Sequence, residues 1–188
     1  VIERFMSPST QIIACDGALN RCLDRDLEPT IVIGDLDSVT PEVLSAFRAA
    51  GGRVIERENQ DHNDLSKALS YARENGAESC IVFGATGGDE QHTWANLLTC
   101  AASLMEVICV GPEQIYRFPT PLHEYSIEVG ADTLFSLFAL PKAEGIRLSG
   151  TTFTLEDETI VMGSQGVHNQ CNSGRVELSF TEGCLMMM

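Results

Sequence analysis

The sequence predicts an α/β protein with an N-terminal doubly wound, mostly parallel sheet covered by helices on both faces, and a C-terminal antiparallel β-sandwich or barrel. Three observations predict this division. Short β-branched runs alternate with helical patterns in the first part of the chain, the alternation is lost near Gly111, and strand-like pieces separated by turn residues continue from there. We therefore expect two domains, residues 1–115 and residues 116–188.

Five apolar runs bounded by Gly, Asp or Pro are expected to form the parallel sheet, each buried on both faces. These runs are residues 11–15, 30–33, 53–55, 80–83 and 107–110. The helices expected between them extend from Thr40–Pro41 to Gly51–Gly52, from Asp64 to Asn75, and from His92 to Met105. In the C-terminal domain, strands are expected at residues 115–118, 124–129, 133–140, 145–148, 159–162 and 175–180.

Composition excludes several classes of partner. The formal net charge is −15, and so acidic a surface repels phosphate backbones, so we expect no nucleic-acid partner. No apolar run is long enough to span a bilayer, so we expect no membrane partner. The seven cysteines contain no Cys-x-x-Cys pair, which favours reduced thiols in a cytoplasmic protein over disulfides or a zinc site. The chain starts at Val1 without an initiator Met, so we expect its native beginning to be missing.

Aspartates follow three of the expected strands. Asp16 follows residues 11–15, Asp35 and Asp37 follow residues 30–33, and Asp61 and Asp64 come after residues 53–55. Because the carboxyl ends of parallel strands meet at one edge of a sheet, these carboxylates should gather there and repel one another unless cations neutralise them. Mg²⁺ binds carboxylate and phosphate oxygens together, so the sequence predicts a magnesium site at this edge.

The individual aspartates also have simpler interpretations. Asp16 or Asp61, taken alone, is equally well explained as a turn residue or helix N-cap. The Asp-x-Asp spacing of Asp35 and Asp37 favours function, because both side chains lie on the same side if the chain there stays extended.

A glycine-rich loop at residues 84–88 joins an expected strand to an expected helix. Its backbone N–H groups and the helix N-terminus form a candidate phosphate site, with Thr86, Gly87 and Gly88 as contacts. It is not a Walker A loop, because no Gly-Lys-Ser/Thr follows, and a tight turn is the alternative. Arg21 and Lys67 are either phosphate ligands or members of surface ion pairs, because each lies about one helical turn beyond an aspartate.

Five segments together resemble the thiamine pyrophosphokinase family: Asp16–Arg21, Gly34–Ser38, Gln60–Leu69, Gly87–Asn96 and, more weakly, Gly163–Asn169. The resemblance covers nearly the whole chain. It implies an α/β catalytic domain, a thiamine-binding β-sandwich, and a homodimer with the active site at the subunit interface. The implied reaction is Mg²⁺-dependent transfer of pyrophosphate from ATP to the thiamine hydroxyl, giving thiamine diphosphate and AMP.

Candidate roles follow from these motifs. The resemblance implies that Asp35, Asp37 and Asp64 bind magnesium and the triphosphate, and the candidate catalytic group adds Asp61 and Lys67. Asp64 or Asp61 is the candidate acceptor of the hydroxyl proton. The candidate nucleotide contacts are Asp16, Arg21, Thr86, Gly87, Gly88 and His92. The candidate thiamine contacts are Gln60, Gln91, Asn96, His168 and Asn169.

The chain also departs from the family pattern. Asp89 stands where the family has Arg, Gln91 where it has an acid, and His168 where it has Ser, and the tail 185–188 has no aromatic residue to stack on thiamine. These departures leave two alternatives open. One is a pyrophosphokinase for another hydroxymethyl heterocycle, such as a pterin, and the other is a thiamine- or nucleotide-binding protein without catalytic activity.

Overall fold

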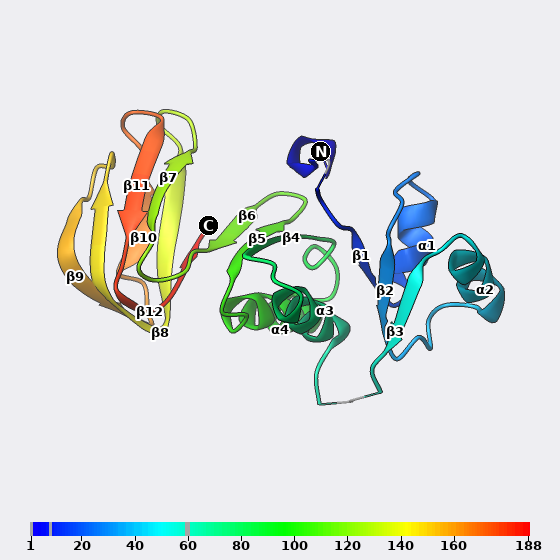
Figure 1. Ribbon diagram of the computed structural model, residues 1–188. Coiled ribbons are helices and arrows are strands. Elements are labelled where there is room, and N and C mark those ends of the chain that lie inside the picture. Colours follow the sequence, from blue (N-terminus) through cyan, green and yellow to red (C-terminus); the bar gives the residue numbers. More distant parts are fainter. Residues whose placement is uncertain (1, 8, 59–60) are drawn as a thin grey trace. The chain divides into compact units, whose positions relative to one another are not determined.

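The computed structural model describes residues 2–7, 9–58 and 61–188 and is a mixed α/β protein (Figure 1). It divides into two compact units, Val1–Ala77 and Glu78–Met188, which we call the first and second unit. The first unit holds a small parallel sheet, and the second holds a curled mixed sheet. The expected domain boundary between residues 115 and 116 stays a prediction.

Sheet A of the first unit has three parallel strands in the order β1-β2-β3. The strands are β1 (Ile13–Cys15), β2 (Ile31–Gly34) and β3 (Arg53–Glu56). The central strand β2 is buried along its whole length, whereas β3 at the edge is only partly buried. The expected burial on both faces therefore holds for the central strand and not for this edge strand, which lacks a neighbour on one side in sheet A.

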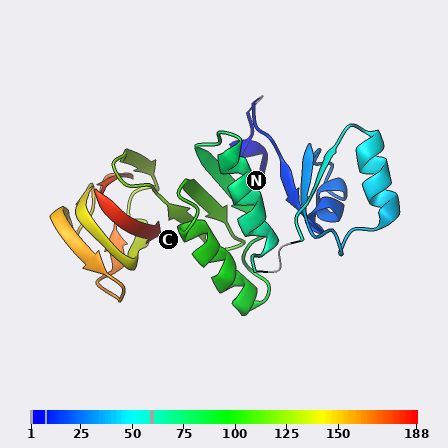
Figure 2. The ribbon, with the colours of Figure 1, turned by 60° about the horizontal axis from the view of Figure 1, so that its bottom comes forward.

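The first unit contains a short 3₁₀ helix, η1, and three α-helices around sheet A: η1 (Ile2–Phe5), α1 (Ala18–Leu23), α2 (Pro41–Ala49) and α3 (Asp64–Glu74). Helices α1 and α2 lie on the same side of sheet A (Figure 2), where Leu19 and Phe47 pack against Val32. Helix α3 packs against β1 and β2, and its Tyr71 belongs to a second core cluster with Ile33. Successive strand residues point to opposite faces of sheet A, and each face is thus buried in its own apolar cluster.

Local signals fix where α2 and α3 begin and end. The Thr40 hydroxyl accepts a hydrogen bond from the Val43 N–H at 3.4 Å, and the Asn63 side chain accepts one from the Ser66 N–H at 2.9 Å. Each cap satisfies a backbone donor that has no partner inside the helix. Gly76 follows α3 at φ 86°, a left-handed conformation that ends a helix without steric cost.

Sheet B of the second unit has nine strands, in the order β4-β5-β6-β12-β8-β11-β7, and β9 and β10 also pair with β8. The strands are β4 (Ser79–Phe83), β5 (Glu106–Val110), β6 (Ile115–Phe118), β7 (Glu124–Glu128), β8 (Leu134–Ser149), β9 (Leu155–Val161), β10 (Gly166–Gln170), β11 (Arg175–Ser179) and β12 (Glu182–Met187). Strands β4 and β5 are parallel, and the other pairings are antiparallel. The C-terminal strands gather around the long β8 (Figure 1) and enclose a core that includes Phe135, Leu137, Ile146 and Val176.

Two expectations about β8 and α4 are wrong in detail. Residues 133–140 and 145–148 form one strand, because Gly145 at φ 64° and a register shift between Ala143 and Ile146 let pairing with β9 continue. Helix α4 (Glu90–Ala101) ends before Met105, because Leu104 adopts φ 58°, which a right-handed helix does not allow. None of the helices within the described residues has the length and apolar character needed to cross a membrane.

Candidate functional site

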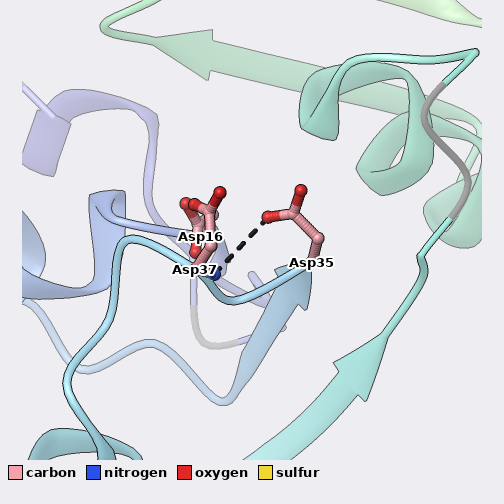
Figure 3. A group of neighbouring side chains, drawn as sticks. All are labelled: Asp16, Asp35 and Asp37. Atoms are coloured by element: carbon pink, nitrogen blue, oxygen red, sulfur yellow. Dashed lines mark hydrogen bonds between the residues drawn. The ribbon is translucent and has the colours of Figure 1, made fainter.

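Three carboxylates meet at the carboxyl ends of β1 and β2 in the first unit. Asp16 directly follows β1, and Asp35 and Asp37 follow β2 (Figure 3). One carboxylate oxygen from each of the three lies within 4.8 Å of the other two. The gathering of acids that the strand ends predict is therefore present for these three residues, which we call the acidic cluster.

Asp16 is the buried member of the acidic cluster. Its exposed fraction is 7%, and its Oδ1 has no hydrogen-bond partner among the described residues. It does not cap a helix, because the N-cap of α1 is Gly17 and no side chain caps that helix. A buried carboxylate oxygen without a partner costs free energy, which indicates that this oxygen faces a ligand site.

The chain between Asp35 and Asp37 is turned, not extended as the simple geometry of the Asp-x-Asp spacing requires. Leu36 has φ 65°, a conformation that costs a non-glycine residue about 1–3 kcal/mol, and its side chain packs against the core of the first unit. The turn brings the Asp37 N–H to 3.5 Å from Asp35 Oδ1, and the Ser38 hydroxyl donates to Asp37 Oδ1 at 2.9 Å. The turn, its hydrogen bonds and the packing of Leu36 thus hold the two carboxylates together.

Asp64, the first residue of α3, lies beside the acidic cluster across Gly34. A Cβ atom added to Gly34 would lie 2.9 Å from the Cβ of Asp16 and 3.2 Å from the Cγ of Asp64. Asp64 Oδ1 accepts a 2.9 Å salt bridge from the ammonium of Lys67, which is only 6% exposed. For Lys67, the ion pair that the sequence offered as an alternative is therefore observed.

The donor set of the acidic cluster fits a divalent cation such as Mg²⁺. All three residues offer carboxylate oxygens, which are the hard ligands this ion prefers, and Asp16 Oδ1 is without a partner among the described residues.

The same site also affects a neighbouring thiol. Burial, together with the charges of Asp64, Cys22 and Asp16, raises the pKa of Cys15 to about 12. Burial is the largest cause of this shift, and the neighbouring carboxylates of Asp64 and Asp16 add to it.

The other candidates of the first unit are exposed or lie outside the described residues. Asp61 is exposed, and α3 is capped by Asn63, so Asp61 does not cap that helix. Arg21 is exposed on α1. Gln60 lies outside the described residues. The predicted metal set of Asp35, Asp37 and Asp64 stays a prediction.

In the second unit, the loop at residues 84–88 precedes α4. The side chain of Asn96 on α4 donates to the Ala85 carbonyl at 2.8 Å and so ties the loop to the helix. Gly87 has φ 87°, and an added Cβ there would lie 2.7 Å from Pro112. The hydroxyl oxygen of Thr86 is buried without a hydrogen-bond partner among the described residues. One polar atom of the candidate phosphate loop is therefore unsatisfied.

Asp89 has a structural role that an arginine could not fill. It is the N-cap of α4, and its Oδ1 accepts a hydrogen bond from the His92 N–H at 3.0 Å. Aspartate caps of this kind stabilise a helix by about 1 kcal/mol. The same carboxylate occupies the helix N-terminus that was expected to attract phosphate, and so weakens anion binding there. Gln91 and His92 are exposed in the first turn of α4.

Asn169 on β10 makes its hydrogen bonds to main-chain groups. Its Oδ1 accepts from the N–H groups of Phe153 at 3.0 Å and Gln170 at 2.9 Å, and its Nδ2 donates to the Phe153 carbonyl at 2.7 Å. His168 is exposed at φ 58°, and its N–H donates to the Ser136 hydroxyl at 3.1 Å.

The second unit also has a groove of about 740 Å³ on sheet B. It is lined by residues that include Arg147 and four acids, Glu124, Glu156, Asp157 and Glu177. None of the candidate site residues lines it, so the groove is separate from the predicted chemistry.

Comparisons with known proteins agree with this architecture. Residues 2–109 match the family model described as "Thiamin pyrophosphokinase, catalytic domain". A thiamine pyrophosphokinase of Bacillus subtilis is 28% identical over 193 aligned residues, which cover 98% of this chain and 89% of the relative. The crystal structure of thiamine pyrophosphokinase from Bacillus subtilis superposes with a TM-score of 0.80 at 23% identity, over 99% of this chain and 90% of that one.

A more distant structure shares the same fold. Thiamin pyrophosphokinase from Candida albicans superposes with a TM-score of 0.71 at 14% identity, over 94% of this chain and 80% of that chain. The matched family model covers more than half of the chain and contains the whole acidic cluster. The chain therefore belongs to the thiamin pyrophosphokinase family.

Proposed function

We propose that this protein transfers the pyrophosphoryl group of ATP to the hydroxyl of thiamine, giving thiamine diphosphate and AMP. The single observation that carries the proposal is the acidic cluster of Asp16, Asp35 and Asp37, placed inside the segment that matches the catalytic domain of this family. The matched family and the relatives named above give no support to a pterin substrate or to binding without catalysis.

Asp16, Asp35 and Asp37 would hold a Mg²⁺ ion. When bound, the ion neutralises these carboxylates and the phosphate oxygens of ATP, so that a polyphosphate can approach an acidic sheet edge. Asp16 would contribute the buried Oδ1 that has no partner among the described residues. Transfer to an alcohol depends on positioning and charge neutralisation more than on covalent chemistry, and rigidly held carboxylates serve both needs.

Asp64 and Lys67 would set the protonation chemistry beside the cluster. The Lys67 ammonium holds one oxygen of Asp64 at 2.9 Å, which leaves the second oxygen as the candidate acceptor of the hydroxyl proton. The exposed Asp61 is the other candidate acceptor. As the family resemblance implies, Asp64 would also bind magnesium and the triphosphate, together with Asp35 and Asp37.

The remaining assignments are part of the same proposal. Arg21, the loop at residues 84–88 and His92 would contact the nucleotide, and Gln60, Gln91, Asn96, His168 and Asn169 would surround thiamine. We further propose a doubly wound catalytic domain at residues 1–115, a thiamine-binding sandwich at residues 116–188, a cytoplasmic location, and a homodimer with its active site at the subunit interface. The free state of all seven cysteines supports a reducing compartment.

Release of AMP tests the proposed function. The protein is mixed with ATP, MgCl₂ and thiamine, and AMP and thiamine diphosphate are quantified by chromatography. We expect both products in equal amounts, and neither without thiamine or in the presence of EDTA. Formation of ADP in place of AMP, or no thiamine-dependent product, would contradict the proposal. A pterin alcohol in a parallel reaction serves as the control for acceptor specificity.

A further inference from the structure

Ser38 in the first unit contacts both loops that carry the acidic cluster. Its hydroxyl donates to Asp37 Oδ1 at 2.9 Å, in the loop that follows β2. Its Cβ lies 3.1 Å from the position that a Cβ atom on Gly17 would occupy, and Gly17 directly follows Asp16 in the loop after β1. One side chain therefore links the two strand ends that supply the three carboxylates (Figure 3).

The contact with Gly17 depends on the absence of a side chain there. Gly17 has φ −57°, a conformation that any residue adopts, so the backbone itself does not require glycine. An added Cβ would instead lie 3.1 Å from the Ser38 Cβ and 3.6 Å from the Ser38 carbonyl oxygen. Two carbon atoms pack best at about 3.5–4.0 Å. Glycine thus allows the loop after β1 to approach Ser38 closely.

The main chain of Asp16 and the side chain of Asp37 are held by different bonds. The Asp16 N–H donates to the Ile33 carbonyl at 2.9 Å, and this bond extends the pairing of β1 with β2 as far as the cluster. Asp37 is exposed, and an exposed carboxylate samples several rotamers unless a neighbouring group holds it. The hydrogen bond from Ser38 holds one oxygen of Asp37 and leaves its other lone pairs for a cation.

The Ser38 hydroxyl does not cap the helix that follows it. The N-cap of α2 is Thr40, whose hydroxyl accepts the hydrogen bond from the Val43 N–H at 3.4 Å. The Ser38 hydroxyl donates to the Asp37 carboxylate, and a hydrogen bond to an ionised group is stronger than one between neutral groups. The hydrogen bond of Ser38 therefore serves the acidic cluster and not the start of α2.

We propose that Ser38 positions the acidic cluster for a divalent cation. Its hydroxyl orients Asp37, and its packing against Gly17 sets the distance between Asp37 and Asp16. The inference rests on the cation-binding part of the proposed function and adds a residue that does not itself bind the ion. Mg²⁺ requires nearly octahedral ligand geometry, so carboxylates held in place bind it more tightly than mobile ones. Losing a hydrogen-bond partner of a metal ligand typically lowers metal affinity about 10- to 100-fold.

Titration with MgCl₂ by isothermal calorimetry tests the role of the hydroxyl. Ser38→Ala should bind Mg²⁺ about five- to tenfold more weakly than wild type, a moderate loss because Ser38 is exposed. Ser38→Thr keeps the hydroxyl and should bind within about twofold of wild type. Ser126→Ala is the matched control, since the Ser126 hydroxyl makes an exposed 2.8 Å hydrogen bond to Glu177 in the second unit. It should bind Mg²⁺ as wild type does.

Gly17→Ala tests the spacing between the two loops. The added Cβ meets the Ser38 Cβ, so the loops must separate, and Mg²⁺ affinity should fall about fivefold or more. In a Ser38→Gly background this Cβ is absent, and Gly17→Ala should then lower the affinity by less than about twofold beyond Ser38→Gly alone. An equal factor in both backgrounds would overturn the spacing role. If Gly17→Ala does not fold, the Ser38 variants still decide whether the hydroxyl orients Asp37.

The outcomes separate this inference from the proposed function. If wild type binds no Mg²⁺, the metal assignment and the inference both fail. If wild type binds Mg²⁺ and Ser38→Ala binds it equally well, or Ser38→Thr is as weak as Ser38→Ala, only the inference is overturned. A metal-free melting temperature more than about 4 °C lower in Ser38→Ala would assign Ser38 a general structural role and also overturn it. If Mg²⁺ binds as expected but no thiamine-dependent AMP appears, the proposed reaction fails while the role of Ser38 stands.

Discussion

Asp16 and Asn169 are equally buried, at 7% exposure each, but their polar atoms are satisfied in opposite ways. Asp16 Oδ1, in the first unit, has no partner among the described residues. The Asn169 amide, in the second unit, makes three hydrogen bonds to main-chain groups. Both residues were candidates for substrate or cofactor contacts, Asp16 because it follows an expected strand and Asn169 through the family resemblance alone.

The difference shows that a buried polar residue can have either of two roles, which its hydrogen bonds in the structure distinguish. A buried polar side chain whose hydrogen bonds are complete stabilises the fold, whereas one with an unsatisfied atom indicates a ligand. The strained backbone supports this interpretation of the acidic cluster. Asp16 and Leu36 adopt φ 42° and φ 65°, and strain of this kind collects at functional sites.

The largest expected effect comes from removing one charge of the acidic cluster. Asp35→Asn should lower the rate of AMP release by about 100-fold or more, because it removes a carboxylate that we propose binds the metal ion, while keeping the side-chain shape. The free energy of unfolding should change little, since repulsion within the cluster also falls. Asp26→Asn is the control, because Asp26 is exposed and lies outside the cluster. Equal activity of Asp35→Asn and Asp26→Asn would mean that Asp35 does not bind the metal ion.

Truncating Asn169 should affect the stability of the protein more than its catalytic activity. Asn169→Ala should lower the free energy of unfolding by about 2–4 kcal/mol, because three hydrogen bonds are lost and buried main-chain groups are left without partners. Asn172→Ala, which removes an exposed side chain with one hydrogen bond, should cost about 1 kcal/mol or less. Denaturant titration of both variants makes the comparison. Equal losses of unfolding free energy in the two variants would mean that the hydrogen bonds of Asn169 to the main chain of Phe153 do not stabilise the fold.

Gly34→Ala tests the close packing between Asp16 and Asp64. The added Cβ would lie 2.9 Å from the Cβ of Asp16, so the cluster must shift to admit it. We expect a loss of about 2 kcal/mol of unfolding free energy, together with a weaker response of stability to Mg²⁺. Gly51→Ala meets no atom within 4 Å and should lose only about 1 kcal/mol, from its positive φ. Equal stability of the Gly34→Ala and Gly51→Ala proteins would show that Asp16 and Asp64 pack less closely around Gly34 than these distances indicate.

The smallest predicted effect concerns Asp89. Asp89→Asn keeps the oxygen that caps α4 but removes a negative charge from the helix N-terminus. If the loop at residues 84–88 contacts phosphate, the KM for ATP should fall about two- to fivefold while thermal stability stays nearly constant. Asp89→Ala is the matched variant, since it removes charge and cap together and should lower stability by about 1 kcal/mol. An unchanged KM for ATP in Asp89→Asn would mean that the loop at residues 84–88 does not contact the nucleotide.

Much of the fold follows from periodicity and caps in the sequence. The parallel strands and the starts of α2 and α3 were predictable as elements, because β-branched runs and the caps Thr40 and Asn63 are local signals. The expectation that all five strands form one N-terminal sheet is wrong, since only β1, β2 and β3 form sheet A and β4 and β5 belong to sheet B. Besides the short 3₁₀ helix η1, three elements were not predicted. Helix α1 has six residues and no side-chain cap, the residues of β10 include His168 at φ 58°, which breaks strand alternation, and β12 ends in methionines without polar alternation.

The acidic cluster was predictable in outline and not in detail. Strand ends in a parallel sheet place Asp16 near Asp35 and Asp37 by topology alone. The turn at Leu36 was beyond the sequence, because it depends on the tertiary packing of the apolar Leu36 side chain. The ion pair of Asp64 with Lys67, in contrast, was one of the two alternatives that their spacing on a helix offered.

Titration of the protein with MgCl₂ by isothermal calorimetry tests the central claim most directly. If Asp16, Asp35 and Asp37 form one cation site, wild type and Asp26→Asn should bind Mg²⁺ with the same affinity. Asp16→Asn should bind at least about tenfold more weakly, because it replaces the carboxylate that supplies the unpartnered buried oxygen. Asp26 is a suitable control, since it also has a positive φ, at 53°. Equal Mg²⁺ affinity of Asp16→Asn and wild type would contradict the account.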